Sequence, residues 1–245
     1  MKRVLLVVEG VAGDDSSPAG HAAERSPLVE AMRQAIAQTY PPDAVTQVAA
    51  DSSTDFSVFP ASDWLICPLT LNLPETLDFP DRTLYAACAE VSSLRLRVAQ
   101  QGQATTDNGS FWLPMIWTAK GCLYGEVIGL ADSSPPCQDS AIQENPEAIA
   151  VQQPIHFPDS LRQPLYQMGY QLLQSLAASP AVYLMQFGVS DRTIAFDRLL
   201  PFPDYPAIAS LGVQAPDLFT CHWRCLTHQP IRDVVIKAPV NYREI

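Results

Sequence analysis

Basic residues and long apolar runs are both scarce in this chain of 245 residues. Lysine and arginine number 15 against 26 aspartates and glutamates, which gives a formal net charge of −11. So few cations disfavour a protein that follows nucleic-acid phosphates or binds an anionic membrane, because both need a dense basic face. No run approaches the roughly 18–20 apolar residues of a membrane span. We therefore expect no membrane span and no nucleic-acid partner.

The sequence also lacks an export signal and a Cys-x₂-Cys metal motif. The apolar run after Lys2 and Arg3 is about five residues long and ends at Glu9, before any small-residue cleavage site. This pattern predicts a buried first strand, a cytoplasmic protein and reduced cysteines. Apolar residues make up 47% of the chain and charged residues 17%, which is typical of a globular fold.

Strands and helices alternate along the chain, which favours an α/β fold with a parallel sheet at its N-terminus. We expect an N-terminal α/β lobe over residues 1–102 and a second lobe over residues 111–245. Apolar residues that recur every three or four positions indicate helices, and short apolar runs between turn residues indicate strands. Expected strands are 4–8, 44–49, 64–67, 111–118, 122–130, 182–187, 193–196 and 234–237; expected helices begin at Ser26-Pro27 and span Leu84–Val98, Leu161–Leu176 and 216–227.

Two motifs in the second lobe have a spacing that is moderately specific. Pro201-Phe202-Pro203 follows a predicted strand pair, and Phe219–Arg224 then reads Phe-x-x-His-x-Arg on a predicted helix. The stretch from Phe157 to Ile231 resembles the C-terminal part of ATP-grasp ligases, closest to carboxyaminoimidazole ribonucleotide synthetase. The resemblance implies an ATP-grasp-like second lobe, which completes the expected α/β fold class.

The departures from the family concern its chemistry. ATP-grasp ligases use two acidic ligands to hold Mg²⁺ on the ATP phosphates. In this sequence the first acidic position falls at Met185 or Gln186, and the second falls at Arg198. The lysine of the family's nucleotide-binding strand corresponds to Thr118, and the chain has three lysines in all. The resemblance therefore implies the scaffold without the metal ligands.

We expect a non-catalytic ATP-grasp-like protein that binds or regulates a protein partner and carries no cofactor. The alternative is a small ligase or nucleotide-binding enzyme with a rebuilt site for ATP and Mg²⁺. Its new carboxylates would come from an acidic, proline-rich segment. They are Asp132, Asp139, Glu144 and Glu147.

Six residues are the candidate ligand-binding set. His222 and Arg224 match family motif positions, yet each could equally form a buried hydrogen bond or an ion pair, for example to Asp197 or Asp217. The glycines after the first strand could cradle phosphate or simply form a surface loop. The set is Arg198, His222, Arg224, Lys120, Gly10 and Gly13.

Three other groups have competing interpretations. Cys221, Cys225 and His228 share one helix face and could bind a soft metal, or they could be core residues. The apolar segment 199–206 could dock a partner or lie buried against the sheet. The last group could be an acid–base cluster or a solvated loop. It comprises Asp14, Asp15, His21 and Glu24.

Overall fold

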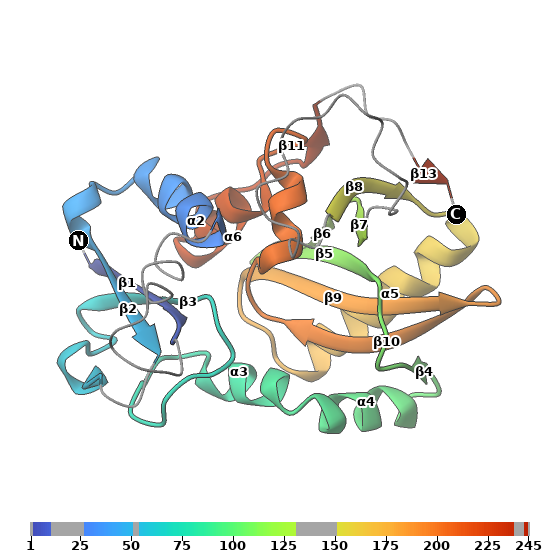
Figure 1. Cartoon of the computed structure of the whole chain (residues 1–245), viewed down its shortest axis with the longest axis horizontal. Coiled ribbons are helices and arrows are strands. Elements are labelled where there is room, and N and C mark those ends of the chain that lie inside the picture. The colour runs from blue at the N-terminus through green and yellow to red at the C-terminus, as the bar shows by residue number, and fades with distance from the viewer. Residues whose placement is uncertain (1, 11–26, 51–53, 131–150, 238–242, 245) are drawn as a thin grey trace, which may run out of the picture.

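Two main β-sheets, of three and eight strands, lie side by side in this protein, with helices α2 (Pro27–Ala37) and α6 (Leu218–Leu226) between them (Figure 1). A third sheet has two strands. The computed structural model describes residues 2–10, 27–50, 54–130, 151–237 and 243–244. Among these residues, no helix combines the length and the apolar character that crossing a bilayer requires. The predicted α/β class is confirmed, with a parallel sheet first and a mixed sheet second.

The smaller sheet is parallel, and its first strand is central. Strand β1 (Arg3–Glu9) pairs with β2 (Val45–Ala50) on one side and with β3 (Trp64–Pro68) on the other. Residues 4–8 are all buried, as expected for a parallel strand covered on both faces. Helix α2 (Pro27–Ala37) packs its apolar stripe into the same core. The three predicted strands and this helix are confirmed.

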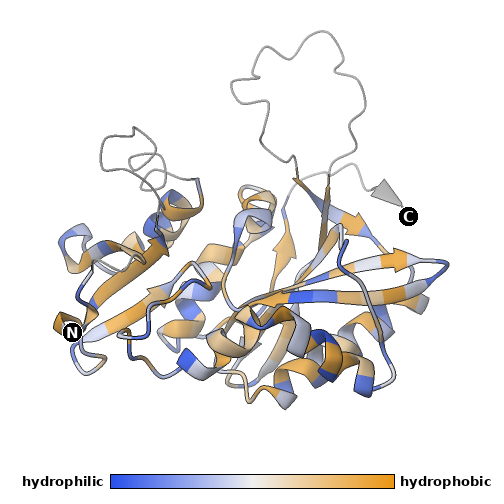
Figure 2. Cartoon of the chain, turned by 60° about the horizontal axis from the view of Figure 1, so that its bottom comes forward, coloured by the Kyte–Doolittle hydropathy of each residue, from blue (hydrophilic) through white to orange (hydrophobic). Residues whose placement is uncertain are grey.

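The larger sheet is mixed and runs in the order β13-β8-β7-β5-β9-β10-β4, with β6 added beside β5. Its long central strands β5 and β9 are antiparallel, as are β9 and β10. Figure 2 shows the strands of both sheets coloured mainly as hydrophobic, in keeping with burial from both sides. The strands are β4 (Ala104–Thr105), β5 (Phe111–Thr118), β6 (Gly121–Tyr124), β7 (Val127–Leu130), β8 (Val151–His156), β9 (Ala181–Ser190), β10 (Thr193–Leu200) and β13 (Arg243–Glu244).

Two hydrophobic cores lie on opposite faces of the larger sheet. Alternate residues of β9 show the division, because Val182 and Leu184 join the core shared with the smaller sheet, whereas Tyr183 and Met185 join the other. The first core also holds α6, and the second holds α3, α4 and α5. The remaining elements are α3 (Arg82–Ala89), α4 (Val91–Gln100), α5 (Asp159–Ser175), α6 (Leu218–Leu226), β11 (Gln214–Ala215), β12 (Val235–Ile236), η1 (Pro42–Ala44), η2 (Phe56–Val58) and η3 (Tyr205–Ser210).

The helix expected from Leu84 to Val98 is two helices, and this prediction was wrong. Glu90 leaves helical geometry at ψ 64°, so α3 ends before it and α4 begins after it. Both helices still bury apolar side chains in the core of the larger sheet, Leu84 from α3 and Leu94 from α4. The proposed lobe boundary near residue 102 stays a prediction, but these helices pack on the second sheet.

Candidate functional site

The strand positions that the family motif assigns to metal ligands face each other across β9 and β10. Gln186 is paired with Arg198, and Met185 is paired with Leu199 on the opposite face of the sheet. Met185 is buried in the core with α5. Of the two residues left open by the sequence, Gln186 is therefore the one that faces Arg198, and the facing pair is an amide and a guanidinium.

Asp197, beside this pair, is a buried carboxylate whose oxygens both have partners. The β-bulge between Phe196 and Arg198 holds it at the strand. Its Oδ1 lies 2.5 Å from Arg95 Nη2, its Oδ2 accepts from the Gly109 N–H at 2.9 Å, and its carbonyl accepts from Arg95 Nε at 3.0 Å. Such charge-assisted bonds are among the stronger hydrogen bonds in proteins. Asp197 is therefore bound to its own chain.

A short segment, Thr106–Gly109, crosses this part of the sheet, and we call it the strap. The Thr106 N–H donates to the Phe196 carbonyl at 2.8 Å, and Gln186 Nε2 donates to the Gly109 carbonyl at 2.6 Å. A Cβ at Gly109 would lie 3.0 Å from atoms of Asp197, Gln186 and Phe187. The strap thus approaches β9 and β10 as closely as backbone can, and only glycine fits there without displacement.

His222 is a buried structural group on α6. Its Nδ1 accepts the Val182 N–H at 3.1 Å, which joins the helix to the start of β9. Burial lowers the pKa of His222 to about 3, so the imidazole is neutral at physiological pH. Within the described part of the chain, its Nε2 has no hydrogen-bond partner. The observed partner is a backbone N–H and not Asp197 or Asp217.

The other members of the candidate set lie apart from one another. Arg224 lines a cavity between α6, α2 and β11, and Lys120 stands exposed in the β5–β6 turn. Gly10 follows the last residue of β1, whereas Gly13 lies outside the described residues. The ligand-binding role of each residue stays a prediction.

Cys221 and Cys225 are buried on α6, and His228 lies just beyond its end with φ 55°. Burial raises the pKa of Cys225 to about 12, and it also raises the pKa of Cys221, so both thiols are protonated. No group of three or more histidine, cysteine or acidic side chains in the described ranges could hold a metal ion. Two further groups from the sequence lie outside these ranges: the cluster of Asp14, Asp15, His21 and Glu24, and the carboxylates Asp132, Asp139, Glu144 and Glu147.

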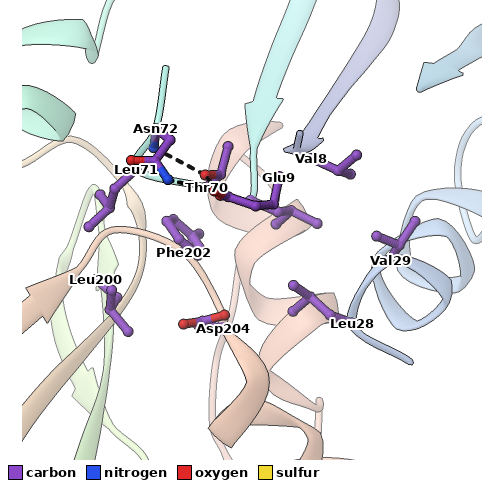
Figure 3. Close-up of a pocket in the computed structure, with 11 residues that line it drawn as sticks. Val8, Glu9, Leu28, Val29, Thr70, Leu71, Asn72, Leu200, Phe202 and Asp204 are labelled. Carbon is purple, nitrogen blue, oxygen red and sulfur yellow. Dashed lines mark hydrogen bonds between the residues drawn. The ribbon is translucent and has the colours of Figure 1, made fainter. Parts of the chain in front are cut away.

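A cavity of about 460 Å³ opens at the carboxyl ends of β1 and β3, and we call it the acidic cavity (Figure 3). Glu9 accepts hydrogen bonds from Thr70 and from Asn72 Nδ2, the latter at 2.5 Å. Asp204 projects from the opposite wall (Figure 3). The remaining lining residues are apolar side chains of α2, β1, the β3 end and the β10 end: Val8, Leu28, Val29, Leu69, Leu71, Leu200 and Phe202.

Electrostatics set the acidic cavity apart from a phosphate site. Burial raises the pKa of Asp204, and the charge of Glu9 raises it further. Among the described residues that line it, none is a lysine, arginine or histidine. Two carboxylates without a cation repel phosphate and favour hydroxyl or amino groups, which donate hydrogen bonds.

The position of this cavity follows from the topology of the smaller sheet. Since β2 lies on one side of β1 and β3 on the other, the strand order reverses at β1. Ligands of open α/β sheets bind in the crevice at such a point. From the sequence alone, Glu9 was interpreted only as the end of a strand. An acidic residue directly after a buried strand was the signal that could have identified it as a candidate site residue.

Tyr85 of α3 holds the two sides of the cavity together. Its hydroxyl lies 3.1 Å from the Pro68 carbonyl at the end of β3 and 3.2 Å from the Pro201 carbonyl after β10. Its ring also stacks on Phe202 with centroids 6.1 Å apart. Of the segment 199–206, most residues are buried, which supports the interpretation of a loop packed against the sheet.

Comparisons with solved structures identify the same architecture elsewhere. An N5-carboxyaminoimidazole ribonucleotide synthetase from Thermotoga maritima matches with a TM-score of 0.67 at 8% identity, over 95% of this chain and 77% of that one. An N5-carboxyaminoimidazole synthetase from Staphylococcus aureus complexed with ADP matches at 0.67 and 8%, over 96% and 81%. A glycinamide-RNase-transformylase T from Mycobacterium tuberculosis matches at 0.61 and 12%, over 94% and 80%. No protein-family model and no curated protein sequence matches the chain.

Proposed function

We propose that this chain, which has the fold of the ATP-grasp ligases, is a binding protein that does not turn over ATP. The observation that carries the proposal is the facing pair on β9 and β10, Gln186 and Arg198. The resemblance implies that ligases have two acidic ligands at these positions. A guanidinium cannot coordinate Mg²⁺, and an amide offers one neutral oxygen. The residues present do not fit a Mg²⁺–ATP complex at this place.

The hydrogen bonds around the strap support the same proposal. The carboxylate nearest to the pair, that of Asp197, already accepts from Arg95 and from the Gly109 N–H. Releasing it for a metal would leave the Arg95 guanidinium without its ion-pair partner. Such a loss costs about 3 kcal/mol or more for a buried pair. The arrangement favours a closed, structural junction over a metal site.

The acidic cavity is the place where we propose that a ligand binds. Its volume of about 460 Å³ lies within the range of small-molecule sites. Glu9 and Asp204 would accept hydrogen bonds from a hydroxyl- or amine-bearing ligand, and the apolar lining would cover its carbon skeleton. A cytoplasmic location and a protein partner that responds to this ligand complete the proposal.

Thermal unfolding with ATP and ADP, each with and without Mg²⁺, tests the proposal. We expect no Mg²⁺-dependent change in the melting temperature at millimolar nucleotide. A ligand present at 100 times its Kd would add about 2.7 kcal/mol, which shifts the melting temperature by several degrees. A shift of that size that requires Mg²⁺ would overturn the proposal.

A second candidate function is a small ligase with a rebuilt metal site, and the acidic cavity is the observation that favours it. Glu9 and Asp204 are two carboxylates in one cavity, which is the ligand type that Mg²⁺ prefers. If the nucleotide shift occurs, Glu9→Gln and Asp204→Asn should each abolish it. Asp63→Asn, at an exposed position, is the matched control and should leave it intact.

A further inference from the structure

A second cavity, of about 390 Å³, lies between the end of α2, the first turns of α6 and the β11–β12 pair. Arg224 and Lys237 line it together with Asp217 and Thr220, and two glutamines, Gln38 and Gln214, complete its polar wall. We call it the cationic cavity. It shares no lining residue with the acidic cavity.

Regular structure fixes the position of each cation. Thr220 and Arg224 are one turn apart on α6, so their side chains share one face of the helix. Lys237 directly follows β12, and its N–H donates to the Val213 carbonyl at 2.8 Å. Gln38 at the end of α2 donates to Thr220 Oγ1 at 3.0 Å, which ties the opposite wall to α6. The cavity is therefore built from elements that are hydrogen-bonded to one another.

The single carboxylate of this cavity does not neutralise its cations. Asp217 caps α6, with Oδ1 accepting from the Thr220 N–H at 2.9 Å and Oδ2 accepting from Thr220 Oγ1 at 2.7 Å. Among the described residues, no acidic side chain forms an ion pair with Arg224 or Lys237. Counted over the described residues, the lining of two cations and one carboxylate thus keeps a formal charge of 2 − 1 = +1, in a chain whose formal net charge is −11.

We propose that the cationic cavity binds a small organic oxyanion, a molecule with a carboxylate or phosphate group. The forked guanidinium of Arg224 matches two oxygens of such a group, and Lys237 adds a point charge. Gln38 and Gln214 have amides suited to hydroxyl or carbonyl groups on the body of the ligand. The volume exceeds that of a bare ion and lies in the range of small-molecule sites. The site is separate from the acidic cavity, so either can fail alone.

Isothermal titration of the full chain at low ionic strength, with inorganic phosphate, glycerol phosphate and succinate, tests this site. We expect at least one probe to bind with a Kd below about 10 mM. Arg224→Gln should weaken that binding about tenfold or more, and Arg224→Lys should weaken it less because the charge remains. Lys237 is exposed and directly follows a strand, so Lys237→Gln should weaken binding without affecting folding. Tighter binding of the two phosphate probes would identify the anionic group of the ligand as a phosphate, and tighter binding of succinate would identify it as a carboxylate.

The matched control is Arg192→Gln, which removes one positive charge from the exposed β9–β10 turn. We expect its affinity to stay close to that of the original chain, because Arg192 is not among the residues that line the cavity. Two results would overturn the proposal. One is that none of the three probes binds; the other is that Arg192→Gln weakens binding as much as Arg224→Gln and Lys237→Gln do. If Arg224→Gln does not fold, the comparison of Lys237→Gln with Arg192→Gln decides.

Discussion

The acidic cavity and the contacts of Asp197 with Arg95 and Gly109, which we call the junction, both contain carboxylates. The carboxylates of the two regions differ in their partners. At the junction, Asp197 is bonded to Arg95 and to the Gly109 N–H, and the Gly109 carbonyl is bonded to Gln186. In the cavity, Asp204 has no ion-pair partner among the described residues, and its pKa is raised by burial and by Glu9.

The difference separates a carboxylate that stabilises the fold from one that is open to a ligand or to solvent. A buried charge that is fully paired within the chain holds the fold together, and breaking the pair is costly. A half-buried carboxyl without a cation costs stability and is retained where a ligand or solvent can satisfy it. Removing the carboxylate should therefore lower the free energy of unfolding in the first region and raise it in the second.

The largest effect is expected from Asp197→Ala, which removes the central acceptor of the junction. Arg95 loses its ion-pair partner and the Gly109 N–H loses its acceptor, so unfolding free energy should fall by about 3 kcal/mol. Urea unfolding measures the loss. Asp43→Ala, at an exposed position, should change it by less than about 0.5 kcal/mol. Equal losses of unfolding free energy for Asp197→Ala and Asp43→Ala would contradict the view that the junction stabilises the fold.

Gly109→Ala tests the close approach of the strap. The new methyl group would meet Asp197, Gln186 and the Phe187 backbone at 3.0 Å, so we expect a loss of about 1–3 kcal/mol. Gly188→Ala is the matched control, because its nearest neighbour would lie at 3.4 Å, an ordinary contact. The same unfolding measurement compares them. A control loss as large as that of Gly109→Ala would show that the strap is not tightly held.

Asp204→Asn should act in the opposite direction and raise stability at neutral pH. Because the folded-state pKa of Asp204 is raised, the folded protein binds its proton more tightly than the unfolded chain does. Stability is therefore lost as the pH rises through this pKa, and the amide escapes that loss. The gain should vanish below the ordinary pKa of aspartate. Urea unfolding at several pH values, with Asp63→Asn as control, measures it; destabilisation at neutral pH would contradict the prediction.

The smallest effect is expected from Arg198→Gln. Arg198 Nε lies 3.4 Å from Asp197 Oδ1, but its side chain is 43% exposed, so the ion pair should contribute less than about 1 kcal/mol. Arg95→Gln breaks the shorter pair, at 2.5 Å, and should cost clearly more. Thermal unfolding of the two variants ranks them. The reverse order would transfer the structural role to Arg198.

The pairing of β9 with β10 could be predicted from the sequence because a short turn links two apolar runs. The facing of Gln186 and Arg198 could not, because the register at the turn would place Arg198 opposite Met185, and the shift between Phe196 and Arg198 moves it to Gln186. The predicted strands and the helix at Leu161–Leu176 were recognisable for the same reason, since apolar periodicity is a local signal. The break at Glu90 has no such signal, because no glycine or proline marks it.

The strap and the two cavities could not be predicted, because their residues meet only through tertiary packing. Gly109 and Asp197 are 88 residues apart in sequence. Glu9 ends a strand of the smaller sheet, whereas Asp204 lies in the loop after β10 of the larger sheet, and periodicity carries no information about which of these ends converge. Arg224 was identified by its motif position, but its neighbour Lys237 was visible in sequence only as one of three lysines.

The Tyr85 hydroxyl, which reaches both the end of β3 and the segment after β10, has a consequence for selectivity. The two walls of the acidic cavity cannot move apart without losing this link. If a ligand binds there as proposed, moving the walls apart for a wider molecule would cost this link, about 1 kcal/mol for a typical hydrogen bond. The cavity should therefore favour ligands whose cross-section fits its present width over ligands that require it to widen.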